Sequence, residues 1–240
     1  MEETKLTFKR YEKKYLLSAR QYAEMQERLS GRIEPDLYFK SAVGSVYYDD
    51  DSYSLIRHSL DKPVYKEKLR LRSYGVPGPE DPVFVELKKK FKGVVYKRRV
   101  ELPVREAEAW LAGERPAPGD SQIVREIDFF LRSHALSPKA YIGCDRTAWV
   151  AVEDPEVRIT FDENLRWRDT DLHLTAGRAG QPLLDTGQAL LEIKLPEASP
   201  LWLARLLSEL EIFPRSFSKY GACYQNDLLE KYFNGVISCV

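Results

Sequence analysis

Residues 64–75 read VYKEKLRLRSYG and place a basic side chain at every second position. Successive side chains of a β-strand point to opposite faces, so this spacing gathers the basic groups on one face. The cationic face would hold Lys66, Lys68, Arg70 and Arg72, and the opposite face Tyr65, Leu69 and Leu71. The segment therefore predicts a strand with one charged and one apolar face.

The same period of two recurs in about eight segments, and helical spacing appears between several of them. Strands are expected at about 5–18, 43–50, 64–74, 82–91, 94–102, 140–152, 156–168 and 189–196. Helices are expected at about 19–30, 51–60, 105–113, 121–134, 199–211 and 222–233. The sequence GVPGPEDP at 75–82 and the pair Lys92–Gly93 are typical of turns, which predicts an antiparallel meander.

We therefore predict an α+β protein with a single domain over residues 1–240. Its centre would be a closed antiparallel eight-stranded β-barrel with helices packed outside, because closure removes the exposed strand edges that invite aggregation.

The composition excludes several classes of protein. The 37 basic and 37 acidic residues give no net charge, so any site for a polyanion must be a local concentration of cations. Three widely spaced cysteines favour a reducing compartment, and the polar N-terminus is unlike a signal peptide. No stretch approaches the roughly 18 apolar residues of a membrane helix. We expect a cytoplasmic protein without direct membrane insertion.

The charged faces of the strands have a biased sign. Charged alternate faces ordinarily look out into water, but solvated surfaces usually mix both signs. Here the basic residues outnumber the acidic ones: Arg10, Lys14, Lys66, Lys68, Arg70, Arg72, Lys88, Lys97, Arg99 and Arg158 against Glu12, Glu86, Asp162 and Glu192. The alternative to a solvated surface is a barrel with a basic lumen and an exterior covered by helices.

A basic lumen with a few carboxylates suits phosphate chemistry. Arginine offers planar forks of donors to phosphate oxygens, and lysine offers point charges. Carboxylates are poor phosphate ligands but good ligands for Mg²⁺ or Mn²⁺. We therefore predict a metal-assisted phosphoryl site.

These motifs resemble the VTC domain, the polyphosphate polymerase catalytic domain, within the CYTH/triphosphate tunnel metalloenzyme superfamily. The resemblance runs from about residue 8 to 225. It rests on the ordered succession of RYEKKY at 10–15, VYYDD at 46–50, KLRLRSYG at 68–75, VFVELKKK at 83–90, YKRRV at 96–100, DRTAW at 145–149, RITFDENL at 158–165, LLEIKLP at 190–196 and FSKYG at 217–221.

The resemblance implies a tunnel fold and the transfer of the ATP γ-phosphoryl group to a growing polyphosphate chain. The candidate catalytic residues are Lys14, Arg70, Arg72, Lys88 and Lys219. The candidate phosphate- and nucleotide-binding residues are Arg10, Lys68, Lys97, Arg99, Arg146 and Arg158. Glu192 is the implied metal ligand, and Glu12 and Glu86 are candidates to complete the metal shell. Arg10 stands where the superfamily carries the first acid of an ExExK motif, which weakens a second metal site.

The sequence leaves two alternatives open. A triphosphatase would transfer the same phosphoryl group to water. A non-catalytic module would bind RNA or another polyanion, although such surfaces usually interleave exposed aromatic and basic side chains. We expect ATP and polyphosphate or triphosphate as partners and no nucleic acid, and leave open a membrane-protein partner. Asp49, Asp50 and Asp51 are expected to cap a helix, and Tyr47 or Tyr48 to pack in the core.

Overall fold

The computed structural model describes residues 11–92, 94–196 and 198–237. The strands are β1 (Tyr11–Leu17), β2 (Ile33–Asp49), β3 (Tyr65–Tyr74), β4 (Pro82–Phe91), β5 (Val94–Pro103), β6 (Ser137–Ala151), β7 (Arg158–Arg168), β8 (Gln181–Pro182) and β9 (Ala189–Leu195). The helices are α1 (Ala19–Leu29), α2 (Ser54–Leu60), α3 (Val104–Leu111), α4 (Gln122–Ser133), α5 (Leu201–Glu209), α6 (Lys219–Cys223) and α7 (Leu229–Ile237). Two short helical turns, η1 (Leu174–Ala176) and η2 (Tyr224–Leu228), complete the described elements.

Local signals in the sequence place most of these elements correctly. Ser18 caps α1 through a capping box with Gln21, and Ser121 accepts a hydrogen bond from the backbone of Val124 at the start of α4. The expected strands at 64–74, 82–91 and 94–102 are β3, β4 and β5, which pair antiparallel as a meander. The first half of β2, residues 33–42, was not predicted.

The prediction of a closed eight-stranded barrel is wrong. The described strands form one sheet in the order β1-β9-β7-β6-β2-β3-β4-β5, with the two-residue β8 paired to β7. In this order β1 and β5 are the two ends, and within the described residues no pairing joins them. Both end strands carry charged side chains, among them Glu12, Lys97 and Arg98. Charge on an edge strand discourages pairing with another strand, so this sheet does not need closure to protect its edges.

The described chain divides into two compact units. Unit 1 comprises Met1–Ser41, Asp145–Asn164 and Leu184–Phe217, and unit 2 comprises Ala42–Cys144, Leu165–Leu183 and Ser218–Val240. Each unit has its own apolar core, in which strand residues of alternate parity pack against helices.

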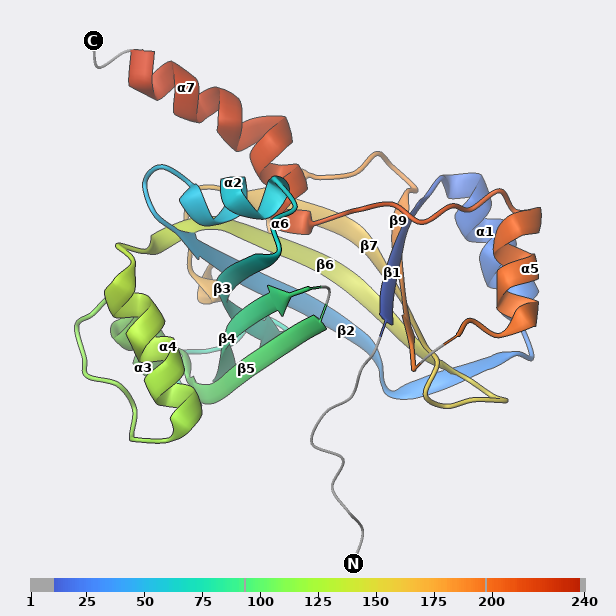
Figure 1. Cartoon of the computed structure of the whole chain (residues 1–240), viewed down its shortest axis with the longest axis horizontal. Helices are drawn as coiled ribbons and strands as arrows, with labels where there is room; N and C mark the ends of the chain where they lie inside the picture. Colours follow the sequence, from blue (N-terminus) through green and yellow to red (C-terminus); the bar gives the residue numbers. More distant parts are fainter. Residues whose placement is uncertain (1–10, 93, 197, 238–240) are drawn as a thin grey trace, which may run out of the picture. The chain divides into compact units, whose positions relative to one another are not determined.

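Helices cover the apolar face of the strands in both units (Figure 1). In unit 2, Leu69 and Leu71 of β3 pack with Trp110 of α3 and Ile127 of α4. In unit 1, the side chains of β1, β7 and β9 that include Phe161 pack with α1 and α5. The charged face of each set of strands is therefore the face that these helices leave uncovered.

Candidate functional site

The meander of unit 2 aligns its charged residues in rows that cross the three strands. Arg70 of β3 pairs with Glu86 of β4, which pairs with Arg99 of β5. The next row is Lys68, Lys88 and Lys97. Arg72 lies two residues beyond Arg70, beside Ser45 of β2. The alternation seen in the sequence thus becomes a two-dimensional array of cations, because antiparallel pairing places side chains of the same parity next to one another.

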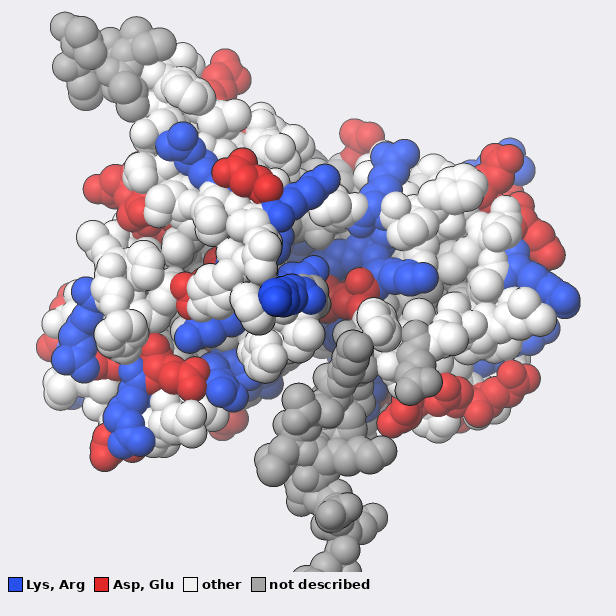
Figure 2. Space-filling model, in the orientation of Figure 1, with Lys and Arg blue, Asp and Glu red and all other residues white. Residues whose placement is uncertain are grey.

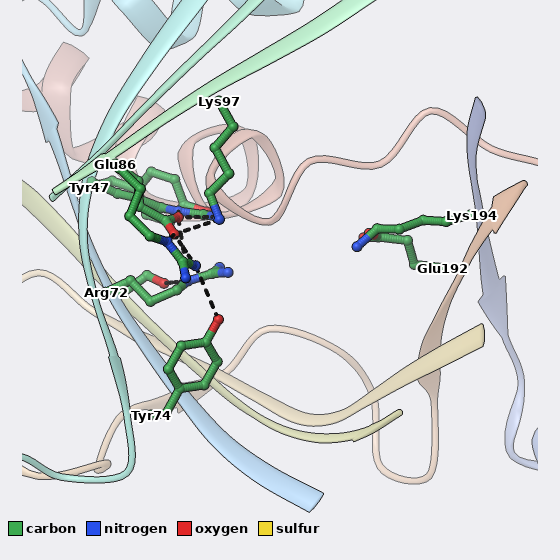
Figure 3. Close-up of polar contacts among 10 residues, drawn as sticks. Tyr47, Arg72, Tyr74, Glu86, Lys97, Glu192 and Lys194 are labelled. Carbon is green, nitrogen blue, oxygen red and sulfur yellow. Dashed lines mark hydrogen bonds and ion pairs between the residues drawn. The ribbon is translucent and has the colours of Figure 1, made fainter. Parts of the chain in front are cut away.

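Glu86 lies at the centre of this array, and its side chain is 1% exposed. Arg70 donates to Oε2 from Nε and Nη2 at 2.8 and 2.6 Å. Arg99 donates to Oε1 from Nε and Nη2 at 2.8 and 2.5 Å. Lys97 Nζ lies 2.6 Å from Oε1, and Arg72 Nε lies 3.9 Å from Oε2. Figure 3 shows the side chain of Lys97 pointing toward the carboxylate of Glu86. We call Glu86, Arg70, Arg72, Lys97 and Arg99 the Glu86 cluster.

The charged groups of the Glu86 cluster shift one another's pKa values. Burial alone would raise the pKa of Glu86, but Arg70, Arg72 and Lys97 outweigh it and hold that pKa well below its usual range. Burial lowers the pKa of Lys97 to about 8, against the opposing effect of Glu86. The carboxylate is therefore ionised at neutral pH, and the cluster carries four cationic side chains to one anionic one.

Tyr47 of β2 extends the Glu86 cluster. Arg70 Nη1 donates to its hydroxyl oxygen at 3.1 Å, and its ring stacks on Tyr220 with centroids 4.9 Å apart. Burial would raise the pKa of Tyr47, but Arg70, Arg72 and Lys219 lower it to about 7. The ring is buried, as expected from the sequence, but its hydroxyl also belongs to the site.

Two of the three aspartates expected to cap α2 do so, Asp49 at the end of β2 and Asp50 after it, whereas Asp51 pairs with Lys139. Asp49 accepts hydrogen bonds from the backbone N–H groups of Leu55 and Ile56 at 2.9 and 3.0 Å, and Asp50 accepts one from Ser54. The Tyr220 hydroxyl donates to Asp49 at 3.2 Å. These contacts anchor α6 beside α2, and α6 begins at a further candidate residue, Lys219.

Two other candidate lysines of unit 2 contact the segment around α6. Lys68 Nζ donates to Ser218 Oγ at 2.7 Å. Lys219 Nζ lies 3.3 Å from the sulfur of the buried Cys144. Ser218 itself caps α6 by accepting from the backbone of Gly221. The FSKYG motif is thereby tied to β3, the strand that carries Arg70 and Arg72.

Unit 1 gathers a second charged group, on β1 and β9. Lys14 pairs with Glu192 and Glu12 with Lys194 in the antiparallel register. Lys14 Nζ lies 3.3 Å from a carboxylate oxygen of Glu12 and 3.7 Å from one of Glu192. Lys194 Nζ lies 3.5 Å from the other oxygen of Glu192, and Figure 3 shows these two side chains adjacent.

The environment of Glu192 keeps it ionised. Burial would raise its pKa, but Lys14, Lys194 and Arg146 lower it to about 2. The side chain is nearly buried, with 9% of the residue exposed. The carboxylates of Glu12 and Glu192 both lie close to the ammonium group of Lys14.

The remaining candidates have different surroundings. Arg146 donates to both carboxylate oxygens of the fully buried Asp162, at 2.6 and 2.7 Å. Arg158 is exposed over 46% of its side chain, and its Nη1 lies 3.6 Å from a carboxylate oxygen of Asp36. Arg10 lies outside the described residues.

The predicted metal ligands do not behave alike. Within the described part of the chain, no three His, Cys, Asp or Glu side chains gather as a metal site. Glu86 is unsuited to bind a metal ion, because Arg70, Lys97 and Arg99 already contact both of its carboxylate oxygens. Glu12 and Glu192 fit better, since they already converge on one positive charge, Lys14 Nζ. Mg²⁺ commonly uses one or two carboxylates, with substrate phosphates and water completing its shell.

The surface in Figure 2 carries both signs of charge, in keeping with the zero net charge. Within the described ranges, every helix is too short or too polar to cross a membrane.

Sequence reasoning missed several members of the site. Tyr74 receives a long contact from Arg99 Nη2 at 3.4 Å, and Asp162, noted only for its parity, is the partner of Arg146. Ser218 had a signal, since it lies inside the quoted FSKYG motif. Tyr74 had none, because its contact with Arg99 depends on the pairing of β3 with β4 and of β4 with β5.

The comparison with known proteins agrees with this architecture. The model of the VTC domain family matches residues 9–226, so the chain belongs to the VTC domain family. Subunit 4 of the vacuolar transporter chaperone complex from Trypanosoma brucei brucei is 26% identical over 220 residues, covering 75% of this chain and 28% of that protein. The Trypanosoma cruzi subunit 4 is 27% identical over 224 residues, covering 75% and 27%. The chain thus spans less than a third of these relatives.

Solved structures share the fold at low sequence identity. A candidate adenylate cyclase from Bacillus halodurans matches with a TM-score of 0.55 and 15% identity, over 86% of this chain and 92% of that one. A candidate adenylyl cyclase from Hippeastrum, described as having a dominant triphosphatase activity, matches with a TM-score of 0.53 and 14% identity, over 89% and 94%.

Proposed function

We propose that this chain is a metal-dependent polyphosphate polymerase that transfers the γ-phosphoryl group of ATP to a growing polyphosphate chain. The observation that carries the proposal is the Glu86 cluster, in which four cations converge around one carboxylate on the strand face opposite α3 and α4. A face with an excess of arginine and lysine suits a ligand with several phosphate groups. Membership of the VTC domain family supports the same substrate class.

The residues present match what phosphoryl transfer requires. The reaction depends mainly on positioning and on stabilising charge on the phosphate oxygens. We assign this work to Lys14, Arg70, Arg72, Lys88 and Lys219, and the binding of the remaining phosphates to Arg10, Lys68, Lys97, Arg99, Arg146 and Arg158. A terminal phosphate acceptor is already ionised, so the transfer needs no general base.

Mg²⁺ or Mn²⁺ would be held by Glu192 with Glu12. When bound, such an ion supplies neutralisation of charge on phosphate oxygens. The chain's own contribution is to keep Glu192 ionised through Lys14 and Lys194.

A triphosphatase is the second candidate, because the Hippeastrum protein of similar fold is described as having a dominant triphosphatase activity. The two reactions differ only in the acceptor, a phosphate chain or water. In either case the chain would be an enzyme acting on a triphosphate.

Incubation of the purified protein with γ-labelled ATP and Mn²⁺ separates the candidates. Long labelled chains together with ADP support the polymerase, and labelled free phosphate supports the triphosphatase. Unchanged ATP, together with tight binding of polyphosphate, would overturn both and favour a non-catalytic module.

A further inference from the structure

Glu86 occupies the position in the meander where an uninterrupted block of positive charge would otherwise form. It stands between Arg70 and Arg99 in one row, and the neighbouring row consists of Lys68, Lys88 and Lys97. Like charges on adjacent strands repel one another. A single carboxylate in the middle strand relieves this repulsion on both sides at once.

The contacts of Glu86 fix how the two arginines are oriented. A guanidinium has five N–H donors in a planar fork. Arg70 directs three of its nitrogens to fixed partners, Nε and Nη2 to Glu86 and Nη1 to Tyr47. Arg99 directs Nε and Nη2 to the other oxygen of the same carboxylate. The planes of both guanidinium groups are therefore set from the protein side, while each retains further N–H groups for a ligand.

These contacts are incompatible with a metal at Glu86. A divalent ion would need the lone pairs that Arg70, Arg99 and Lys97 now use. It would also stand next to four cationic side chains, each of which would repel it. The carboxylate is 1% exposed, so water could do little to screen that repulsion.

We infer that Glu86 is a positioning residue, an internal counterion that holds Arg70, Arg72, Lys97 and Arg99 as one array and shares these cations with the phosphate ligand. The four cations and one carboxylate leave three net positive charges for the ligand. The part of this inference that concerns the ligand rests on the proposed function, and the part that concerns charge balance does not.

Neutralising the Glu86 carboxylate should destabilise the array of cations around it. Glu86→Gln keeps the shape of the side chain and removes its charge, so the four cations lose the carboxylate that offsets their charge. The melting temperature without ligand should fall. Glu86→Gln combined with Lys97→Gln returns the net charge to that of the wild type, so the double variant should be more stable than Glu86→Gln alone.

Tripolyphosphate should stand in for the missing carboxylate. We expect it to raise the melting temperature of Glu86→Gln more than that of the wild type, and to bind about tenfold more tightly at low salt because one repulsive charge has gone. Mn²⁺ alone, titrated calorimetrically, should bind Glu86→Gln and the wild type equally.

Glu126→Gln is the matched control. Glu126 also holds an arginine fork, accepting from Nε and Nη2 of Arg98 at 2.9 and 3.3 Å, on the opposite face of β5. This variant should respond to tripolyphosphate as the wild type does.

Each outcome decides a separate point. A double variant no more stable than Glu86→Gln, including the case in which neither folds, would overturn the counterion role. The counterion role would also be overturned if tripolyphosphate stabilised Glu86→Gln no more than it stabilises the wild type. Weaker binding of Mn²⁺ to Glu86→Gln than to the wild type would overturn it as well. If tripolyphosphate stabilises neither the wild type nor Glu126→Gln, the proposed function fails, and the melting temperatures without ligand still test the charge balance.

Discussion

Replacing Arg70 by alanine tests whether the cationic face of the meander binds phosphate. Arg70 contributes charge-assisted hydrogen bonds, which are worth about 1.5–3 kcal/mol each. Loss of one such bond to a phosphate oxygen should weaken tripolyphosphate binding by about tenfold to 150-fold, since 1.4 kcal/mol corresponds to a factor of about ten. The expected effect is therefore large enough to measure directly.

The same substitution should have a smaller effect on stability. Breaking a buried ion pair typically costs about 3–5 kcal/mol, because a charge is left without a partner. Glu86 retains Arg99 and Lys97 when Arg70 is removed. We therefore expect a loss of about 1–3 kcal/mol in the free energy of unfolding, below the range for an isolated pair.

Isothermal titration calorimetry with tripolyphosphate, at fixed ionic strength and without added metal, measures the affinity. Arg98→Ala is the control, because Arg98 precedes Arg99 in β5 and makes the same kind of fork with Glu126 on the other face. It should bind tripolyphosphate like the wild type. Equal affinities of Arg70→Ala and the wild type, or equal losses in both variants, would refute the assignment of Arg70 to the ligand-binding face.

Three further predictions address the other charged groups. Glu192→Gln should abolish metal-dependent turnover of γ-labelled ATP while tripolyphosphate binding persists, and unchanged turnover would remove Glu192 from the mechanism. The pKa of Tyr47 is lowered to about 7, below the unfolded value near 10, so its ionisation adds stability as pH rises between these values. Tyr47→Phe should lack that increment when melting temperatures are compared at about pH 6 and about pH 9, and parallel pH profiles would contradict it. Arg146→Ala should reduce stability to urea by about 3–5 kcal/mol, because the buried Asp162 would lose the guanidinium that binds both its carboxylate oxygens. The combination of Arg146→Met with Asp162→Leu should recover most of this loss, and a double variant as unstable as the single one would argue against the pair.

The sequence by itself was informative wherever a structural signal is local. The alternation from Lys66 to Arg72 predicts a strand with a cationic face, and β3 is that strand. Ser18 and Ser121 mark the beginnings of two helices because a cap acts within one turn. The order of the family motifs also indicated the family, and the match of the family model over residues 9–226 confirms it.

Only the tertiary structure decided which strands are neighbours. The first half of β2 escaped prediction because its residues are mostly exposed or half-buried and show no apolar alternation. The open order of the sheet replaced the predicted barrel, since closure depends on pairing between strands distant in sequence. Strand pairing also decides the role inferred for Glu86. Its parity is visible in the sequence, but its place between Arg70 and Arg99 follows from the register of three strands. A period of two reports the local geometry of the backbone, and the charge surrounding each side chain is set by long-range pairing that no local pattern encodes.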